Sequence, residues 1–308
     1  MTKDLLISAN KPLLSQQPAP VSSRQAELTR QFLAPLLAEL EQYLLAVRAE
    51  TDAALAPLLS KDAERPYPKG RCTEISLDVQ KRMQQRLSQP QHPVEQALVA
   101  FLRGGGIIRH IWGALRESYF QNAFQFGALY VDVSNDTVVV TKPKVEILPM
   151  EDSGLLAIAD LPHFARVAER YWNTTLYANH AAPSLAPVLP MIGWTPGSPM
   201  RLHSVSDYMI DMMRRDAFKG AREWLASAPV LPDEVAAQLR QYGSARVPIV
   251  QSDGGKAALA ACDSAAQAEA HLDLDWRAAR IADYFALVAN AATAQAGDSS
   301  ALRAGSAT

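Results

Sequence analysis

Three side chains in the middle of the sequence belong to the types that perform nucleophilic acyl transfer, namely Cys72, His110 and Asp132. They occur in the order thiol, imidazole, carboxylate, 38 positions (110 − 72) and 22 positions (132 − 110) apart. In such a set the thiolate attacks a carbonyl carbon, the imidazole takes up the thiol proton and the carboxylate orients the imidazole. The three residue types therefore predict a Cys-His-Asp triad that works through an acyl-thioester.

The surroundings of Cys72 favour a thiol at the start of a helix. Gly70 supplies a turn, and residues 74–83 then have the composition of a helix with acids early and bases late. Unpaired N–H groups in the first turn of a helix stabilise a thiolate. The alternative interpretation is a small buried hydrophobic residue, which is a common role of cysteine.

His110 and Asp132 lie in two segments that we expect to be strands. Residues 107–115 and 128–133 are rich in β-branched, aromatic and apolar residues. If the two segments pair antiparallel about residue 121, Asp132 falls opposite His110, with about 5 Å between their Cβ atoms. This register predicts a carboxylate that holds one imidazole nitrogen while the other nitrogen faces Cys72.

The same residues resemble a known superfamily. The run YPKGRCTEIS at 67–76 is similar to the aromatic-Pro-x-Gly-x-Cys motif of bacterial transglutaminase-like, papain-like cysteine enzymes. HIW at 110–112 resembles their His-Ala-Trp strand, and DVSND at 132–136 resembles their Asp-Ile-Thr-x-Asp ending. The resemblance covers roughly residues 65–140. It implies a thiol hydrolase or acyltransferase (peptidase, amidase, deamidase or transglutaminase) that acts on a peptide, protein or small amide and needs no cofactor.

The sequence departs from the family pattern in two places. Residues 117–127 separate the two expected strands by more than the tight connection of the superfamily, and Ile111 stands where the family has Ala. The first departure leaves Asp136 as a second candidate for the acid that orients the histidine. For the oxyanion we expect the backbone N–H of Cys72, with Gln121 or Asn122 as candidates for a second donor, although side chains of an exposed loop are the other interpretation.

Periodicity and proline positions predict the organisation of the whole chain. We expect a flexible segment at 1–22, an α+β catalytic-type domain at 23–252 and an Ala-rich helical extension at 253–308 that ends in a disordered tail from residue 295. Within the domain, a small antiparallel sheet packs on the helix of Cys72, and many helices precede and follow it. Pro35 should kink or divide the first long helical segment. We also expect a strand at 138–140 and helices at 161–172 and 205–225.

The charge and the residue composition make some classes of partner unexpected. A formal net charge of -2 makes nucleic acid an unexpected partner, and the sequence contains no apolar run long enough to span a membrane. With Cys72 and Cys262 as the only cysteines there is no disulfide framework, so we expect a reducing, cytoplasmic compartment, with export by a system that reads no cleavable signal left open. His163 and His180 lack the spacing of metal ligands, and we expect no metal.

A second function class remains open on sequence grounds. The large helical remainder is also typical of a non-catalytic binding or adaptor protein built on a papain-like core. A metal-dependent enzyme in the helical half is the least favoured alternative. The sequence does not indicate the substrate, the choice between hydrolysis and amine transfer, or the oligomeric state.

Overall fold

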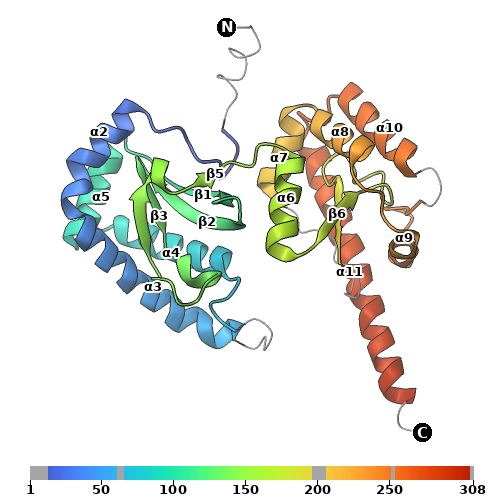
Figure 1. The fold of residues 1–308 in the computed structure, drawn as a ribbon, viewed down its shortest axis with the longest axis horizontal. Helices are drawn as coiled ribbons and strands as arrows, with labels where there is room; N and C mark the ends of the chain where they lie inside the picture. Colours follow the sequence, from blue (N-terminus) through green and yellow to red (C-terminus); the bar gives the residue numbers. More distant parts are fainter. Residues whose placement is uncertain (1–12, 61–65, 196–205, 251–253, 306–308) are drawn as a thin grey trace. The chain divides into compact units, whose positions relative to one another are not determined.

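The computed structural model describes residues 13–60, 66–195, 206–250 and 254–305 (Figure 1). The protein is of the α+β class, as predicted. It divides into two compact units, Met1–Ala157 and Ile158–Thr308, at a boundary that the sequence did not indicate. The expected flexible segment at 1–22 lies largely outside the described residues.

The first unit begins with helices. Ser22 caps the first helix by accepting a hydrogen bond from the backbone N–H of Gln25. Pro35 lies in a short 3-10 turn that separates the first two α-helices, which confirms the division predicted at this proline. The helices are α2 (Ser23–Phe32), η1 (Ala34–Leu36), α3 (Leu37–Leu59), α4 (Cys72–Leu87) and α5 (Pro93–Arg103).

A five-stranded antiparallel sheet follows the helices. Its strands lie in the order β4-β3-β2-β1-β5. Neighbouring strands in the chain therefore pair with each other, and the last short strand returns to the free edge of the first. The strands are β1 (Ile108–Leu115), β2 (Tyr119–Phe126), β3 (Leu129–Asp132), β4 (Glu146–Pro149) and β5 (Leu155–Leu156), with short helical turns η2 (Asn135–Thr137) and η3 (Met150–Asp152) between them.

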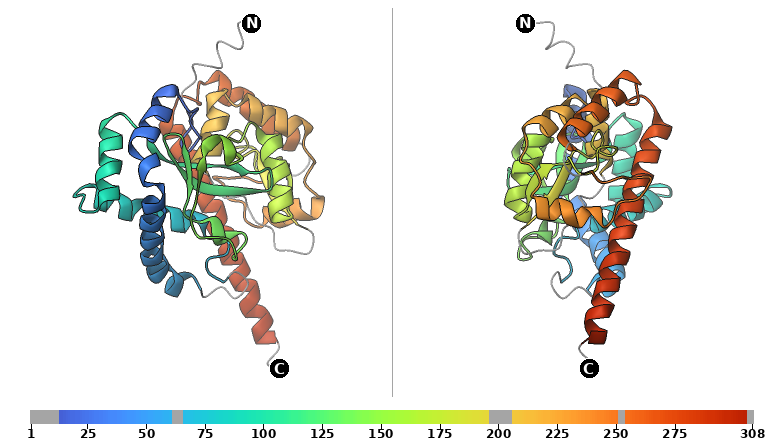
Figure 2. Two further views of the ribbon diagram at one scale, coloured as in Figure 1. Left: turned by 60° about the vertical axis from the view of Figure 1, so that its left-hand side comes forward. Right: turned by 90° about the vertical axis from the view of Figure 1, so that its right-hand side faces the viewer.

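The two faces of this sheet bury different side chains. One face, which includes Phe124, Phe126 and Val131, packs against apolar residues of α2 to α5 and forms the larger core. Figure 2 shows the sheet and these helices from two further sides. The opposite face carries a smaller cluster that includes Ile111 and Tyr130. Side chains alternate between the faces along each strand, so the register determines which residues can meet.

Strand β2 occupies a segment for which the sequence predicted a connection. Residues 117–127 were expected to be a loop or a short helix between two paired strands. Instead residues 116–118 form a tight turn, in which Arg116 and Glu117 both have φ of 52°, and Tyr119–Phe126 pairs with β1 along its full length. Alternating aromatic residues stabilise this strand despite three polar amides. Residues 138–140, predicted as a strand, form turns.

The second unit is mainly helical. Its helix α6 (Leu161–Trp172) has the bounds that the sequence predicted. The segment expected as one helix near 205–225 is broken where Ala217 and Phe218 adopt positive φ, and the expected tail from 295 is helical as far as Gly305. The other elements are β6 (Thr175–Ala178), β7 (Met191–Trp194), α7 (Asp207–Arg215), α8 (Lys219–Ser227), α9 (Asp233–Arg240), α10 (Gly254–Gln267) and α11 (Leu274–Gly305).

Of the helices that the structure describes, none combines the length and the apolar composition that a bilayer crossing requires.

Candidate active site

The loop before Cys72 is anchored to the turn that follows β3. Gly70 has a φ of 70°, a left-handed conformation that glycine adopts without a steric penalty. Its N–H donates to the carbonyl oxygen of Thr137 at 2.8 Å. Cys72 is then the first residue of α4, so the predicted position of the thiol at a helix start is confirmed.

A buried network of ion pairs and hydrogen bonds also connects the loop before Cys72 with α3 and with the turn after β3. The fully buried Arg48 of α3 donates to both carboxylate oxygens of Asp136, at 2.8 and 3.1 Å, and to the carbonyl oxygen of Val133 at 2.7 Å. Arg48 also donates to Asp52, which accepts a hydrogen bond from the hydroxyl of Tyr67 at 2.5 Å. Two parallel N–H···O bonds make a strong pair. Asp136 is therefore committed to Arg48, and the structure does not place it as the acid that orients His110.

The polar side chain next to the thiol is Asn122 of β2. Its amide donates to Cys72 Sγ at 3.5 Å and to Thr73 Oγ1 at 2.9 Å. Asn122 is 5% exposed, so it is neither in a loop nor in solvent, contrary to one of the two interpretations of the sequence. Cys72 thus lies where the side-chain amide of Asn122 meets the first turn of α4, whose first N–H groups have no partner within the helix. These are the donors that an oxyanion formed at Cys72 would require.

The thiol is protonated in this environment at neutral pH. Burial raises the pKa of Cys72, and the nearby carboxylate of Asp132 raises it further, while the hydrogen bond from Asn122 lowers it. The burial effect is the largest, so the net direction is upward. The helix start alone does not make Cys72 a thiolate at rest.

Asp132 lies at the end of β3, on the face of the sheet that bears Tyr130. One carboxylate oxygen accepts hydrogen bonds from Gln121 at 2.8 Å and from the hydroxyl of Tyr130 at 3.0 Å. The other accepts from the backbone N–H of Ser134 at 2.8 Å and from its hydroxyl at 3.1 Å. The position is fully buried, and burial raises the pKa of Asp132 to about 6. Gln121 is consequently occupied here and is not near the thiol, which leaves Asn122 as the second donor.

His110 lies on the other face of the sheet. Strand pairing places it opposite Phe124, and the two rings are 5.4 Å apart between centroids. The predicted register, with Asp132 opposite His110, is therefore wrong, because β2 lies between the two strands and alternation sends the two side chains to opposite faces. The spacing of His110 and Asp132 in the sequence could not predict their separation. The separation depends on β2, and the polar amides of β2 had suggested a loop instead of a strand.

The ring of His110 forms its hydrogen bond with Gln16 and not with Cys72. Its Nδ1 lies 3.1 Å from the side-chain nitrogen of Gln16. The backbone carbonyl oxygen of Gln16 accepts a hydrogen bond from the backbone N–H of Trp112. Its Nε2 is buried without a hydrogen-bond partner in the described part of the chain. Burial lowers the pKa of His110 to about 4, so the ring is neutral at pH 7. Gln16 carries no signal in the sequence that would have indicated this contact.

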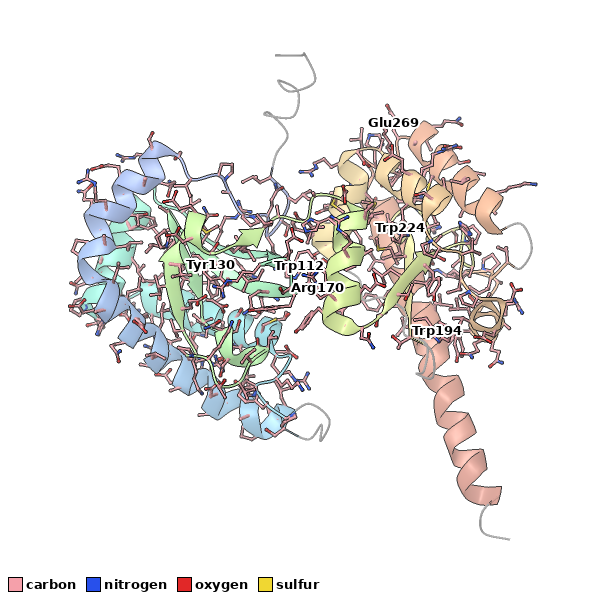
Figure 3. All side chains as sticks on the ribbon, in the orientation of Figure 1. Trp112, Tyr130, Arg170, Trp194, Trp224 and Glu269 are labelled. Carbon is pink, nitrogen blue, oxygen red and sulfur yellow. The ribbon has the colours of Figure 1, made fainter. Side chains whose placement is uncertain are left out.

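The register also places His110 relative to Asn122, the side chain that contacts Cys72. The β1 residue opposite Asn122 is Trp112, which stacks on Phe120 with ring centroids 5.3 Å apart; Figure 3 labels Trp112 on the sheet. His110 is two residues further along the strand, about 7 Å at 3.4 Å per residue. The structure therefore brings the loop of Cys72 and the turn after Asp132 together next to Asn122, whereas His110 lies two residues along β1 from the strand partner of Asn122.

Two serine hydroxyl groups connect α4 with the segment that follows β3. Ser76, one turn after Cys72 in α4, has its hydroxyl 3.5 Å from that of Ser134. The hydroxyl of Ser134 also lies 3.2 Å from the carbonyl oxygen of Asn122. Both serines are fully buried. Among the described residues, no group of three or more His, Cys, Asp or Glu side chains is placed to hold a metal ion.

Comparison of the chain with protein-family models, with curated proteins and with solved structures gives no match.

Proposed function

We propose that the first unit is a cysteine-dependent acyl-transfer enzyme with Cys72 as its nucleophile. The observation that supports this most is that three separate segments meet at the start of α4. The turn at Gly70 leads into Cys72, the amide of Asn122 contacts its sulfur, and the 3-10 turn after Asp132 binds Gly70 through the carbonyl oxygen of Thr137. Two of these segments carry the motifs that resemble transglutaminase-like, papain-like enzymes. The resemblance implies an amide substrate, cleaved by water or transferred to an amine.

The proposed reaction begins with loss of the thiol proton. The sulfur of Cys72 then attacks a carbonyl carbon, so that a C–S bond forms and the bond to the leaving amine or alkoxide breaks. Asn122 and the first N–H groups of α4 would stabilise the negative charge on the carbonyl oxygen. Water or a second amine then attacks the thioester and returns the thiol.

His110 is the nearest candidate for the base in this proposal. Its ring shares the face of the sheet with Asn122, and its Nε2 is free of protein partners among the described residues. To reach Cys72, the ring must rotate away from Gln16 and pass Trp112. The proposal therefore requires a movement of His110, and Gln16 is the contact that must break.

A second candidate function is a non-catalytic binding or adaptor domain. It is favoured by the pKa of His110 near 4 together with the raised pKa of Cys72, since a weakly basic imidazole is poorly matched to a weakly acidic thiol. The separation of Asp132 from His110 favours it as well. In this case the polar groups around Cys72 serve to hold α4 on the sheet.

Turnover of an activated acyl donor separates the two functions. With p-nitrophenyl acetate, acyl transfer predicts release of p-nitrophenolate that Cys72→Ala abolishes and Cys262→Ala, the matched control, leaves unchanged. His110→Gln should slow acylation by about tenfold or more, in the range of general-base effects. Equal rates for the wild-type protein and Cys72→Ala would reject the enzyme and leave the binding domain.

A further inference from the structure

A short segment before the first helix lies along the part of β1 that β5 leaves unpaired. Strand β5 pairs only with the last two residues of β1. Further along the same edge, the backbone carbonyl oxygen of Gln16 accepts a hydrogen bond from the N–H of Trp112 at 2.9 Å. The guanidinium of Arg109 donates to the carbonyl oxygen of Leu14 at 3.2 Å. Residues 14–19, which we call the strap, therefore lie against this edge of the sheet.

The far end of the strap is attached to β2. The backbone N–H of Ala19 donates to the side-chain oxygen of Gln125 at 2.8 Å, and the amide of Gln125 donates back to the carbonyl oxygen of Ala19 at 2.9 Å. Among the side chains of the strap only that of Leu14 is buried. A segment that is held by hydrogen bonds and buries little apolar surface can open while the rest of its unit stays folded, since such local opening costs less free energy than unfolding the core.

Gln16 occupies a strained position within the strap. The N–H of Gln17 donates to the carbonyl oxygen of Leu14 at 3.1 Å and closes a turn in which Gln16 is the third residue. Its φ is 61°, a left-handed value that glycine or asparagine adopts more readily at this position of a turn. Residues held in such a conformation cluster at active sites and switch regions. The turn brings the amide of Gln16 to the ring of His110, with 3.1 Å between the amide nitrogen and Nδ1.

The contact with Gln16 determines which nitrogen of His110 carries the proton. The nitrogen of a side-chain amide only donates, so Nδ1 accepts the hydrogen bond and the proton of the neutral ring is on Nε2. A general base requires a free lone pair within reach of the proton that it removes. In this state the lone pair of Nδ1 is engaged by Gln16, and Nε2 has none to offer because it is protonated. His110 therefore cannot accept the proton of Cys72 while the strap is in place.

We infer that the strap is an autoinhibitory segment that holds His110 in a form unable to serve Cys72, and this inference rests on the function proposed above. When the strap lifts, Nδ1 loses its amide partner, and the ring is free to turn and to exchange its proton between the two nitrogens. The observed rate of acyl transfer is then the rate of the open protein multiplied by the fraction of molecules that are open. Displacement of the strap from β1 would therefore activate the enzyme.

Substitutions of Gln16 test the strap in the full chain. Gln16→Leu removes the amide, and Gln16→Pro fixes φ at about −65° and so excludes the turn that the strap forms. Both variants should release p-nitrophenolate from p-nitrophenyl acetate about tenfold or more faster than the wild-type protein, measured as the part of the rate that Cys72→Ala removes. Gln96→Leu, which makes the same change at an exposed position of α5, is the matched control and should have no effect.

The imidazole of His110 gives a second readout that does not depend on turnover. Nitrogen-15 NMR of labelled histidine should show the proton on Nε2 in the wild-type protein, where burial lowers the pKa of His110 to about 4. In Gln16→Pro the ring loses its contact with the strap, and the pKa of His110 should rise toward the ordinary value of 6.5. The signals of His92, an exposed residue at the start of α5, are the reference and should be the same in both proteins.

The outcomes separate the strap from the function that it is inferred to control. Equal Cys72-dependent rates in the wild-type protein and in both Gln16 variants would overturn the inhibition and leave the proposed enzyme in place. A proton on Nδ1 of His110 in the wild-type protein, or an unchanged pKa of His110 in Gln16→Pro, would also overturn it. Absence of Cys72-dependent release from every variant would instead reject the proposed function, and with it the role of the strap.

Discussion

The opposite pKa shifts of His110 and Asp132 predict two opposite pH dependences of stability within one sheet. Burial lowers the pKa of His110 from 6.5 to about 4, so the unfolded chain takes up a proton before the folded chain does as the pH falls. The contribution of the neutral His110 ring to the free energy of unfolding is therefore present above pH 6.5 and is lost as the pH falls from 6.5 to 4. Burial raises the pKa of Asp132 from 3.8 to about 6, so its ionisation destabilises the fold as the pH rises from about 4 to 6.

The two shifts are of similar size. Each corresponds to about 3 kcal/mol at 1.36 kcal/mol per pKa unit, as an order of magnitude for a buried group. In the wild-type protein the two effects nearly cancel between pH 7 and pH 4. Single substitutions separate them, because every other group titrates alike in variant and wild type.

The test compares His110→Gln and Asp132→Asn with the wild-type protein. On going from pH 7 to pH 4, the stability of the wild-type protein relative to His110→Gln should fall by about 3 kcal/mol, and relative to Asp132→Asn it should rise by about as much. Denaturant-dependent hydrogen exchange of β1 and β2 measures the free energy of unfolding of the first unit by itself. Differences of less than about 1 kcal/mol, or of the opposite sign, would refute the assignment of these buried charges.

Two further predictions concern the framework of the site. Arg48→Met leaves the carboxylate of Asp136 buried without its partner and should reduce the free energy of unfolding by about 3–5 kcal/mol in denaturant titrations. The control Arg30→Met removes an exposed ion pair and should reduce it by less than about 1 kcal/mol. Equal losses in the two variants would contradict the role given to the buried pair. Asn122→Leu removes the amide that lowers the pKa of the Cys72 thiol. Alkylation of Cys72 by iodoacetamide should therefore need a higher pH in this variant than in the wild-type protein. An unchanged pH profile of alkylation would show that the contact does not act on the sulfur.

Local patterns in the sequence predicted several helix positions well in both units. The turn at Gly70, the start of α4 at Cys72 and the bounds of α6 all follow from short-range preferences for turns, dipoles and apolar spacing. Such signals depend on neighbours in the chain, and therefore the sequence shows them directly. The α+β class follows from the same signals.

The pairing of the strands could not be predicted in the same way. Gln121 and Asn122 suggested a loop, yet the aromatic residues beside them keep Tyr119–Phe126 in the sheet. One additional strand moved Asp132 away from His110 and to the opposite face. The partners that the structure gives these side chains, Gln16 for His110 and Arg48 for Asp136, lie 94 and 88 positions away in the chain. No local pattern encodes contacts of that range.

The acyl-thioester itself is the most direct test of the proposed nucleophile. The protein would be mixed with p-nitrophenyl acetate, quenched in acid and mapped by peptide mass spectrometry, with Cys262 as the internal reference, since burial raises the pKa of its thiol to about 12. The account predicts an acetyl group on Cys72, at most a trace on Cys262, and loss of the adduct when the protein is incubated before quenching. A protein that carries no acetyl group on Cys72, or carries as much on Cys262, would contradict it.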